Sequence, residues 1–186
     1  MVYIFLANGF EESEALVPLD MMRRAGIEVT TVSINKTNEV TGSHGITVCA
    51  DRTSKNLMRD IGEGEDLECV MLPGGLPGAH NLDKDETVDR MLAAAVLRGS
   101  FIAAICAAPF ILGMRGYLFE KKAVCYPGFE DKLEGAILSE KSVVRDGNII
   151  TAKSAGFSFE FAYELIRALR GLDEAEKVMN AIYYKI

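Results

Sequence analysis

Cys106 is the residue of this sequence whose position best suits chemistry. It follows an apolar run of strand length, Phe101–Ile105, and precedes small residues and a proline that begin an apolar helix. A cysteine at such a joint is held on a sharp turn, and the start of the helix places partial positive charge near its sulfur. This environment favours the thiolate and predicts a nucleophile. Free cysteines are also often plain buried residues, so position alone leaves both interpretations open.

Two further segments carry groups that can act beside a sulfur nucleophile. Glu11, Glu12 and Glu14 begin a predicted helix after the first apolar run, where the helix dipole alone accounts for acidic side chains. Gly74 and Gly75 follow another apolar run. They either form a tight turn or direct backbone amides into a cleft, where amides bind an oxyanion. Both features allow a structural and a functional interpretation.

The remaining cysteines and the two histidines favour structural roles. Cys49, Cys69 and Cys125 are expected to be buried strand residues, and the absence of a Cys-X-X-Cys spacing argues against a disulfide framework or a structural zinc site. His44 and His80 fall in turn-like segments, which favours a turn or surface role. Neither a metal nor an organic cofactor is expected.

The elements that position these residues alternate between strands and helices. Apolar and helical periodicities predict strands over 2–7, 27–34, 67–72 and 101–105, a short strand over 45–50, and helices over 11–25, 87–97, 157–170 and 172–184. Asp146-Gly147 predicts a hairpin between strands 142–145 and 148–152. This alternation indicates one α/β domain, residues 1–186, with a mostly parallel sheet covered on both faces. Since ligands bind beyond the carboxyl ends of such strands, Cys106, the glycine turn and the acidic helix start are expected around one crevice.

Composition narrows the function classes. The chain has 186 residues, of which 49% are hydrophobic and 25% charged, an ordinary balance for a globular protein. A net charge of −7 argues against binding to a nucleic-acid backbone. The first residues lack a basic segment, and their apolar run is too short for a signal peptide. No run approaches membrane-spanning length. A cytoplasmic protein without a membrane partner is therefore expected.

Four segments in order, residues 9–15, 72–75, 103–109 and 158–162, resemble the ThiJ/PfpI superfamily, in the branch of the Parkinson-disease-associated protein deglycase and its bacterial relatives. The resemblance covers essentially the whole chain. It implies a flavodoxin-like three-layer sandwich, a homodimer, and a strained nucleophile elbow at Cys106. It assigns to Glu14 a carboxyl that hydrogen-bonds the sulfur, and to the backbone near Gly74, Gly75 and Ala107 the binding of an oxyanion.

The sequence departs from these relatives at two places and differs from the peptidase branch at a third. Tyr126 stands where many eukaryotic-type members carry histidine; a tyrosine is a poorer base near neutral pH, so Tyr126 is expected to shape the pocket or donate a hydrogen bond. Residues 153–156 replace a common Gly-Pro-Gly turn at the pocket rim. Ala107 stands where the peptidase branch carries histidine directly after the cysteine, so efficient proteolysis is not expected.

The resemblance implies a cysteine-dependent glyoxalase or deglycase. Such an enzyme acts on methylglyoxal-type dicarbonyls or early glycation adducts without glutathione or a metal. The alternative is an oxidative-stress sensor or chaperone that uses oxidation of Cys106, because an accessible thiolate is also the form that is most easily oxidised. A peptidase or a thiamine-pathway enzyme is less favoured. A flavodoxin or a response regulator is disfavoured because the sequence shows no phosphate-binding loop after the first strand and has Pro73-Gly74 where a phosphoacceptor aspartate would stand.

Overall fold

A seven-stranded, mostly parallel sheet forms the centre of the protein. The computed structural model describes residues 1–55, 57 and 66–185. The strands lie in the order β10 (Val143–Asp146), β11 (Ile149–Ala152), β7 (Phe101–Ile105), β6 (Cys69–Leu72), β1 (Val2–Leu6), β2 (Val29–Ser33) and β5 (Arg52–Thr53). All neighbours pair in parallel except β10 and β11, which are antiparallel. The mostly parallel sheet predicted from the alternation of elements is confirmed.

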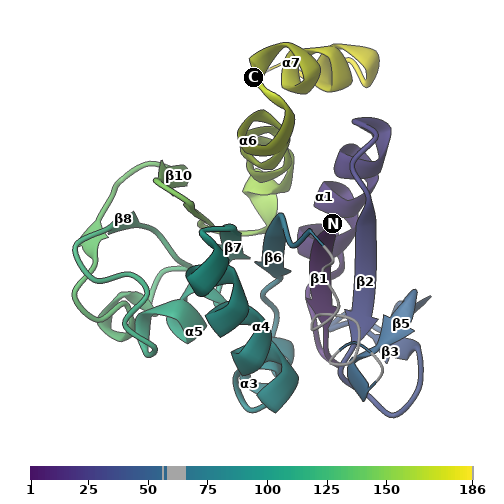
Figure 1. Cartoon of the computed structure of the whole chain (residues 1–186), viewed down its shortest axis with the longest axis vertical. Helices are drawn as coiled ribbons and strands as arrows, with labels where there is room; N and C mark the ends of the chain where they lie inside the picture. Colours follow the sequence, from purple (N-terminus) through teal and green to yellow (C-terminus); the bar gives the residue numbers. More distant parts are fainter. Residues whose placement is uncertain (56, 58–65, 186) are drawn as a thin grey trace.

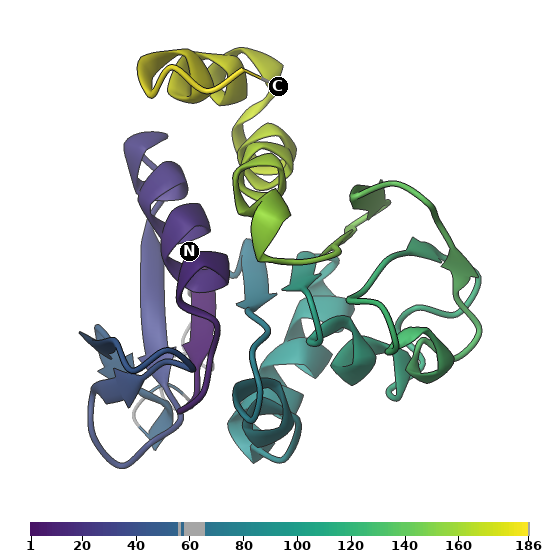
Figure 2. The ribbon, with the colours of Figure 1, turned by 180° about the vertical axis from the view of Figure 1, so that it is seen from behind.

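Helices cover both faces of this sheet (Figure 1). One layer contains α3 (Gly78–Asp83), α4 (Glu86–Arg98) and α5 (Pro109–Gly113), and the other contains α1 (Glu12–Arg24), α6 (Ser158–Arg170) and α7 (Leu172–Ala181). Along β1, Tyr3 and Phe5 pack into the first layer, whereas Val2, Ile4 and Leu6 pack into the second. This alternation follows from the two-residue period of a strand, and it explains why β1 is apolar throughout. Seen from behind, α1 and α6 lie side by side (Figure 2).

Each predicted strand and helix corresponds to an observed element, with ends that shift by at most three residues. The hairpin at Asp146-Gly147 is also confirmed: Asp146 pairs with Ile149, and Gly147 has a φ of 60°. The predicted strand over 45–50 corresponds to β4 (Thr47–Cys49). The sequence prediction missed α3, β5, the strand β3 (Glu39–Thr41) that pairs with β4, and the parallel pair β8 (Lys122–Ala123) and β9 (Ile137–Leu138). These elements are too short to show a periodicity.

Three predicted positions need correction. Cys49 is exposed rather than buried, because β4 belongs to the outlying pair with β3 and not to the central sheet. Cys125 is buried as expected but lies just after β8, not in a strand. His80 lies in helix α3 with its ring 5.2 Å from that of Phe110, not in a turn. Cys69 is a buried strand residue, as predicted. None of the described helices is both long and apolar enough to cross a membrane.

Candidate functional site

Cys106 occupies a strained turn between β7 and α5. Its φ is 65°, a left-handed conformation that costs energy for a residue with a side chain. Two backbone hydrogen bonds hold it there: its N–H donates to the carbonyl of Ala152 at 2.9 Å, and its carbonyl accepts from the N–H of Tyr126 at 2.7 Å. The side chain is half-buried. The turn therefore lifts the sulfur out of the sheet at the carboxyl end of β7, where the elbow was predicted.

Glu14, in the first turn of α1, is the carboxyl that lies against this sulfur. Its side chain has no exposed surface, and Oε2 accepts a hydrogen bond of 3.0 Å from the N–H of Gly74. Oε1 is buried and makes no hydrogen bond of regular geometry with any described residue. The carboxyl and the Cys106 sulfur nevertheless lie within hydrogen-bonding reach of each other. A proton between them would satisfy both groups, since two anions at this separation repel.

Burial controls the acidity of both groups. It raises the pKa of Glu14 to about 7, and the negative charge of Glu11 adds to this effect, while hydrogen bonds from Cys106 and Gly74 oppose it. Burial likewise raises the pKa of Cys106 to about 12, and the Glu14 carboxylate adds to this by repulsion. This direction is opposite to the one expected from the helix start, because burial dominates, an acidic neighbour faces the sulfur, and α5 has only five residues. The pair, rather than Cys106 alone, determines where the proton resides.

The glycine turn after β6 brings the backbone close to both side chains. A Cβ on Gly74 would lie 2.6 Å from the Cβ of Cys106 and 2.6 Å from Oε2 of Glu14, so only glycine fits between them. The carbonyl of Gly74 accepts a hydrogen bond from the N–H of Glu11 at 3.0 Å, which ties the start of α1 to the end of β6. Gly75 has a φ of 86°, a conformation that favours glycine.

Backbone N–H groups from two elements face the sulfur. Those of Gly75 and Ala107 lie near Cys106 and lower the pKa of its thiol, against the effect of burial. The structure therefore brings together the predicted Cys106, Glu14, Gly75 and Ala107, with Gly74 between them. Tyr126 joins the site through its backbone bond to Cys106, whereas its side chain is 47% exposed. These amides are placed to stabilise negative charge that develops next to the sulfur.

The roles of two residues at the site were not predicted from the sequence, because these residues act through their backbones. Ala152, at the end of β11, fixes the elbow by accepting the hydrogen bond from Cys106. The backbone of Ala155, in the segment that differs from the Gly-Pro-Gly turn of relatives, lies near the Glu14 carboxyl and lowers its pKa. Alanine carries no polar side chain, so only the strand order, which places β11 beside β7, reveals these roles.

The other two glutamates at the start of α1 bind the turn between β3 and β4 instead of the sulfur. Oε1 of Glu12 accepts from the N–H of His44 at 2.8 Å, and its Oε2 lies 3.0 Å from Nδ1 of His44. Oε2 of Glu11 lies 3.2 Å from the hydroxyl of Ser43. The acidic helix start therefore combines one carboxyl for the sulfur with two that anchor a neighbouring turn.

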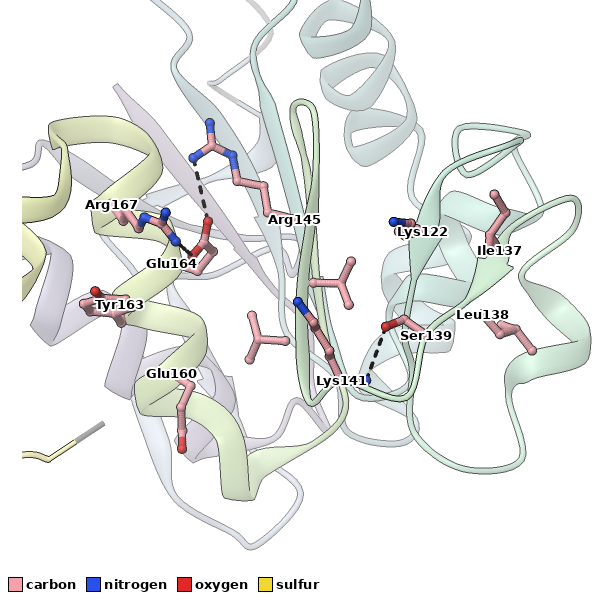
Figure 3. A pocket seen from close by; sticks show the side chains of 12 residues that line it. Lys122, Ile137, Leu138, Ser139, Lys141, Arg145, Glu160, Tyr163, Glu164 and Arg167 are labelled. Atoms are coloured by element: carbon pink, nitrogen blue, oxygen red, sulfur yellow. Dashed lines mark hydrogen bonds and ion pairs between the residues drawn. The ribbon is translucent and has the colours of Figure 1, made fainter.

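A separate cavity of about 520 Å³ lies between β10, α6 and β9 and does not include the elbow (Figure 3). Glu164 pairs on its wall with Arg145 at 3.7 Å and with Arg167 at 3.3 Å. Its lining residues are Lys122, Ile137, Leu138, Ser139, Lys141, Val143, Val144, Arg145, Glu160, Tyr163, Glu164 and Arg167. None of the predicted site residues is among them, so this cavity and the candidate site are distinct.

Comparison with known proteins places this geometry in a family. Residues 1–168 match the DJ-1/PfpI family. The chain is 36% identical over 185 residues to the Parkinson disease protein 7 homolog of Danio rerio, which covers 98% of this chain and 96% of that protein. The structure of oxidized Toxoplasma gondii DJ-1 superposes with a TM-score of 0.93 at 33% identity, covering 100% of this chain and 98% of the other. That of Drosophila melanogaster DJ-1beta gives 0.90 at 30% identity, with 100% and 98% covered. The fold is thus flavodoxin-like, as predicted, and the chain belongs to the DJ-1/PfpI family.

Proposed function

We propose that the protein converts methylglyoxal-type dicarbonyls, free or as early glycation adducts, into hydroxy acids without glutathione. The observation that carries this proposal is the strained Cys106 sulfur with the Glu14 carboxyl on one side and the N–H groups of Gly75 and Ala107 near it. A sulfur nucleophile, a proton carrier and an oxyanion-binding group are what addition to an aldehyde requires.

In the proposed reaction the deprotonated sulfur of Cys106 adds to the aldehyde carbon and forms a hemithioacetal. The backbone amides stabilise the alkoxide that results. Glu14 then moves a proton from the former aldehyde carbon to the neighbouring carbonyl carbon, which converts the adduct into a thioester of the hydroxy acid. Water cleaves the thioester, releases lactate from methylglyoxal and restores the thiol. Methylglyoxal and one water thus give lactate, with no net oxidation or reduction.

The test is lactate release from methylglyoxal by the wild type, Cys106→Ser and Glu14→Gln. We expect Cys106→Ser to abolish turnover, because the hydroxyl is a far weaker nucleophile, and Glu14→Gln to slow it about 10²- to 10⁴-fold, because an amide cannot carry the proton. Near-ultraviolet circular dichroism checks that the variants stay folded. Turnover by Cys106→Ser at the wild-type rate would refute the proposal.

A second candidate function is sensing of oxidants, supported by the buried Glu14 carboxyl that lies within hydrogen-bonding reach of the sulfur. Oxidation of Cys106 by two equivalents of peroxide gives a sulfinate and two waters, and a protonated Glu14 can donate a hydrogen bond to a sulfinate oxygen. Mass spectrometry after mild peroxide treatment distinguishes the roles. Double oxygenation confined to Cys106 in a protein that releases no lactate would favour the sensor over the enzyme.

A further inference from the structure

The start of α1 and the turn between β3 and β4 bring two carboxylates and an imidazole together. Nδ1 of His44 lies 3.0 Å from Oε2 of Glu12 and 3.2 Å from Oε2 of Glu11. The hydroxyl of Ser43 lies 3.2 Å from the same oxygen of Glu11, 3.3 Å from that of Glu12 and 3.1 Å from Nδ1 of His44. Three oxygen atoms and one nitrogen atom that could each bind a metal ion thus lie around one point.

The second oxygen of each carboxylate is held by a different donor. Oε1 of Glu12 accepts from the backbone N–H groups of His44 at 2.8 Å and Ile46 at 3.4 Å. Oε1 of Glu11 accepts from the hydroxyl of Ser13 at 2.9 Å. These bonds fix the rotation of both carboxylates and leave each Oε2 directed at His44. Such outer hydrogen bonds are what orient the ligands of protein metal sites.

The charge of this cluster points to a cation. The side chain of Glu12 is only 8% exposed, and that of Glu11 19%, yet in the described part of the chain neither forms an ion pair with lysine or arginine. Among the described residues, the side-chain partner of both that can carry positive charge is His44, which is 70% exposed. Carboxylates withdrawn from water are normally paired with a permanent charge or coordinate a metal. Two negative charges facing one imidazole leave room for a divalent ion.

We propose that Glu11, Glu12 and His44 form a binding site for Zn²⁺, with Ser43 at the fourth corner. Zinc binds oxygen and imidazole nitrogen at about 2.0–2.1 Å in a tetrahedron, whose corners lie about 3.3 Å apart. The five donor separations above, from 3.0 to 3.3 Å, correspond to the edges of that tetrahedron. An imidazole with two carboxylates favours Zn²⁺ over Mg²⁺ or Ca²⁺, which prefer oxygen ligands alone and in larger number.

Binding exchanges a proton for the metal and involves no redox step. Nδ1 of His44 gives up its proton to solvent, and Nε2 keeps the proton of the neutral ring. The ion cross-links α1 to the turn between β3 and β4. Zinc binding involves neither Cys106 nor the proposed reaction, so each of the two proposals can be tested without the other.

The experiment titrates ZnCl₂ into chelator-stripped protein in competition with a chromophoric zinc indicator. We expect one ion per chain, and a loss of affinity of about tenfold or more in His44→Ala and Glu11→Gln. His44→Ala is the main variant, because its side chain is largely exposed and its removal leaves the core intact. X-ray absorption at the zinc edge should show nitrogen and oxygen near 2.0 Å and no sulfur near 2.3 Å.

The controls are His80→Ala, Cys49→Ser and Cys106→Ser, each of which removes another zinc-binding side chain. We expect all three to keep the wild-type affinity. The proposal is overturned if the wild type binds no zinc, if His44→Ala binds it unchanged, or if a cysteine variant loses it. Circular dichroism of each variant separates loss of a ligand from loss of the fold.

Discussion

At the scale of residues, Cys106 and Glu14 behave as one acid with two sites. Burial raises the pKa of both, and each negative charge disfavours the other. Between the two macroscopic titrations the pair holds a single proton, and the reactive arrangement places that proton on the carboxyl. The strained φ of Cys106 and the hydrogen bond from Gly74 to Glu14 keep the two groups together.

This coupling predicts how activity depends on pH. Below about pH 7 both groups are protonated and the sulfur cannot react; as pH rises through about 7 the pair loses one proton and becomes active. We therefore expect kcat/KM for methylglyoxal to rise with an inflection near pH 7. In Glu14→Gln only the thiol titrates, so this inflection should vanish. An unchanged inflection in Glu14→Gln would show that another group controls the reaction.

At the scale of elements, the site depends on how closely the end of β6 approaches the elbow after β7. The two strands pair in parallel with Leu72 opposite Ala104, so the glycine turn and Cys106 leave the sheet side by side. Gly74 fills the space between Cys106 and Glu14, where a Cβ would meet both at 2.6 Å. Close packing at this point sets the distance between nucleophile and carboxyl.

We expect Gly74→Ala to lower stability by about 1–3 kcal/mol, the usual cost of overpacking, and to reduce turnover by separating Cys106 from Glu14. Urea unfolding and lactate release measure the two effects. Gly156→Ala is the matched control, because its nearest neighbour to an added Cβ is Ser154 Oγ at 4.0 Å and its φ is not positive. Equal losses in both variants would contradict the role given to the close approach.

The strands of the central sheet other than β5 follow from the sequence because each lies in an apolar run or beside a clear hairpin signal, whereas β5 has only two residues. Phe101–Ile105 is continuous and apolar, and its observed ends coincide with the predicted ones. The carboxyl-edge rule then places Cys106, the glycine turn and the acidic helix start around one crevice before any coordinate is known, and the family resemblance singles out Glu14 among the three glutamates. What the sequence does not reveal depends on long-range pairing. The backbone contributions of Ala152 and Ala155, and the approach of His44 to Glu12 from 32 positions away, have no local signal.

At the scale of the whole molecule, Glu68 forms ion pairs that join distant parts of the chain beside the sheet, one with the N-terminal ammonium of Met1 at 2.9 Å and one with Arg170. Nη1 of Arg170, at the end of α6, lies 2.6 Å from Oε1 of Glu68, which immediately precedes β6. The two residues are 102 positions apart. Arg170 is the largest cause that lowers the pKa of Glu68 to about 2, while burial acts in the opposite direction. The pair thus fastens the last turn of α6 to the sheet.

Because the folded pKa of Glu68 lies below its unfolded value of 4.5, the stabilisation is present above pH 4.5 and is lost as pH falls toward 2. We expect Glu68→Gln to cost about 1 kcal/mol at pH 7, a value discounted for solvent screening of a partly exposed pair. The difference from the wild type should shrink below pH 4.5 and vanish near pH 2. Urea unfolding at several pH values measures it. Glu86→Gln, whose side chain is 87% exposed, is the control and should show no such trend. A constant difference for Glu68→Gln down to pH 2 would mean that packing, rather than charge, fastens α6 to the sheet.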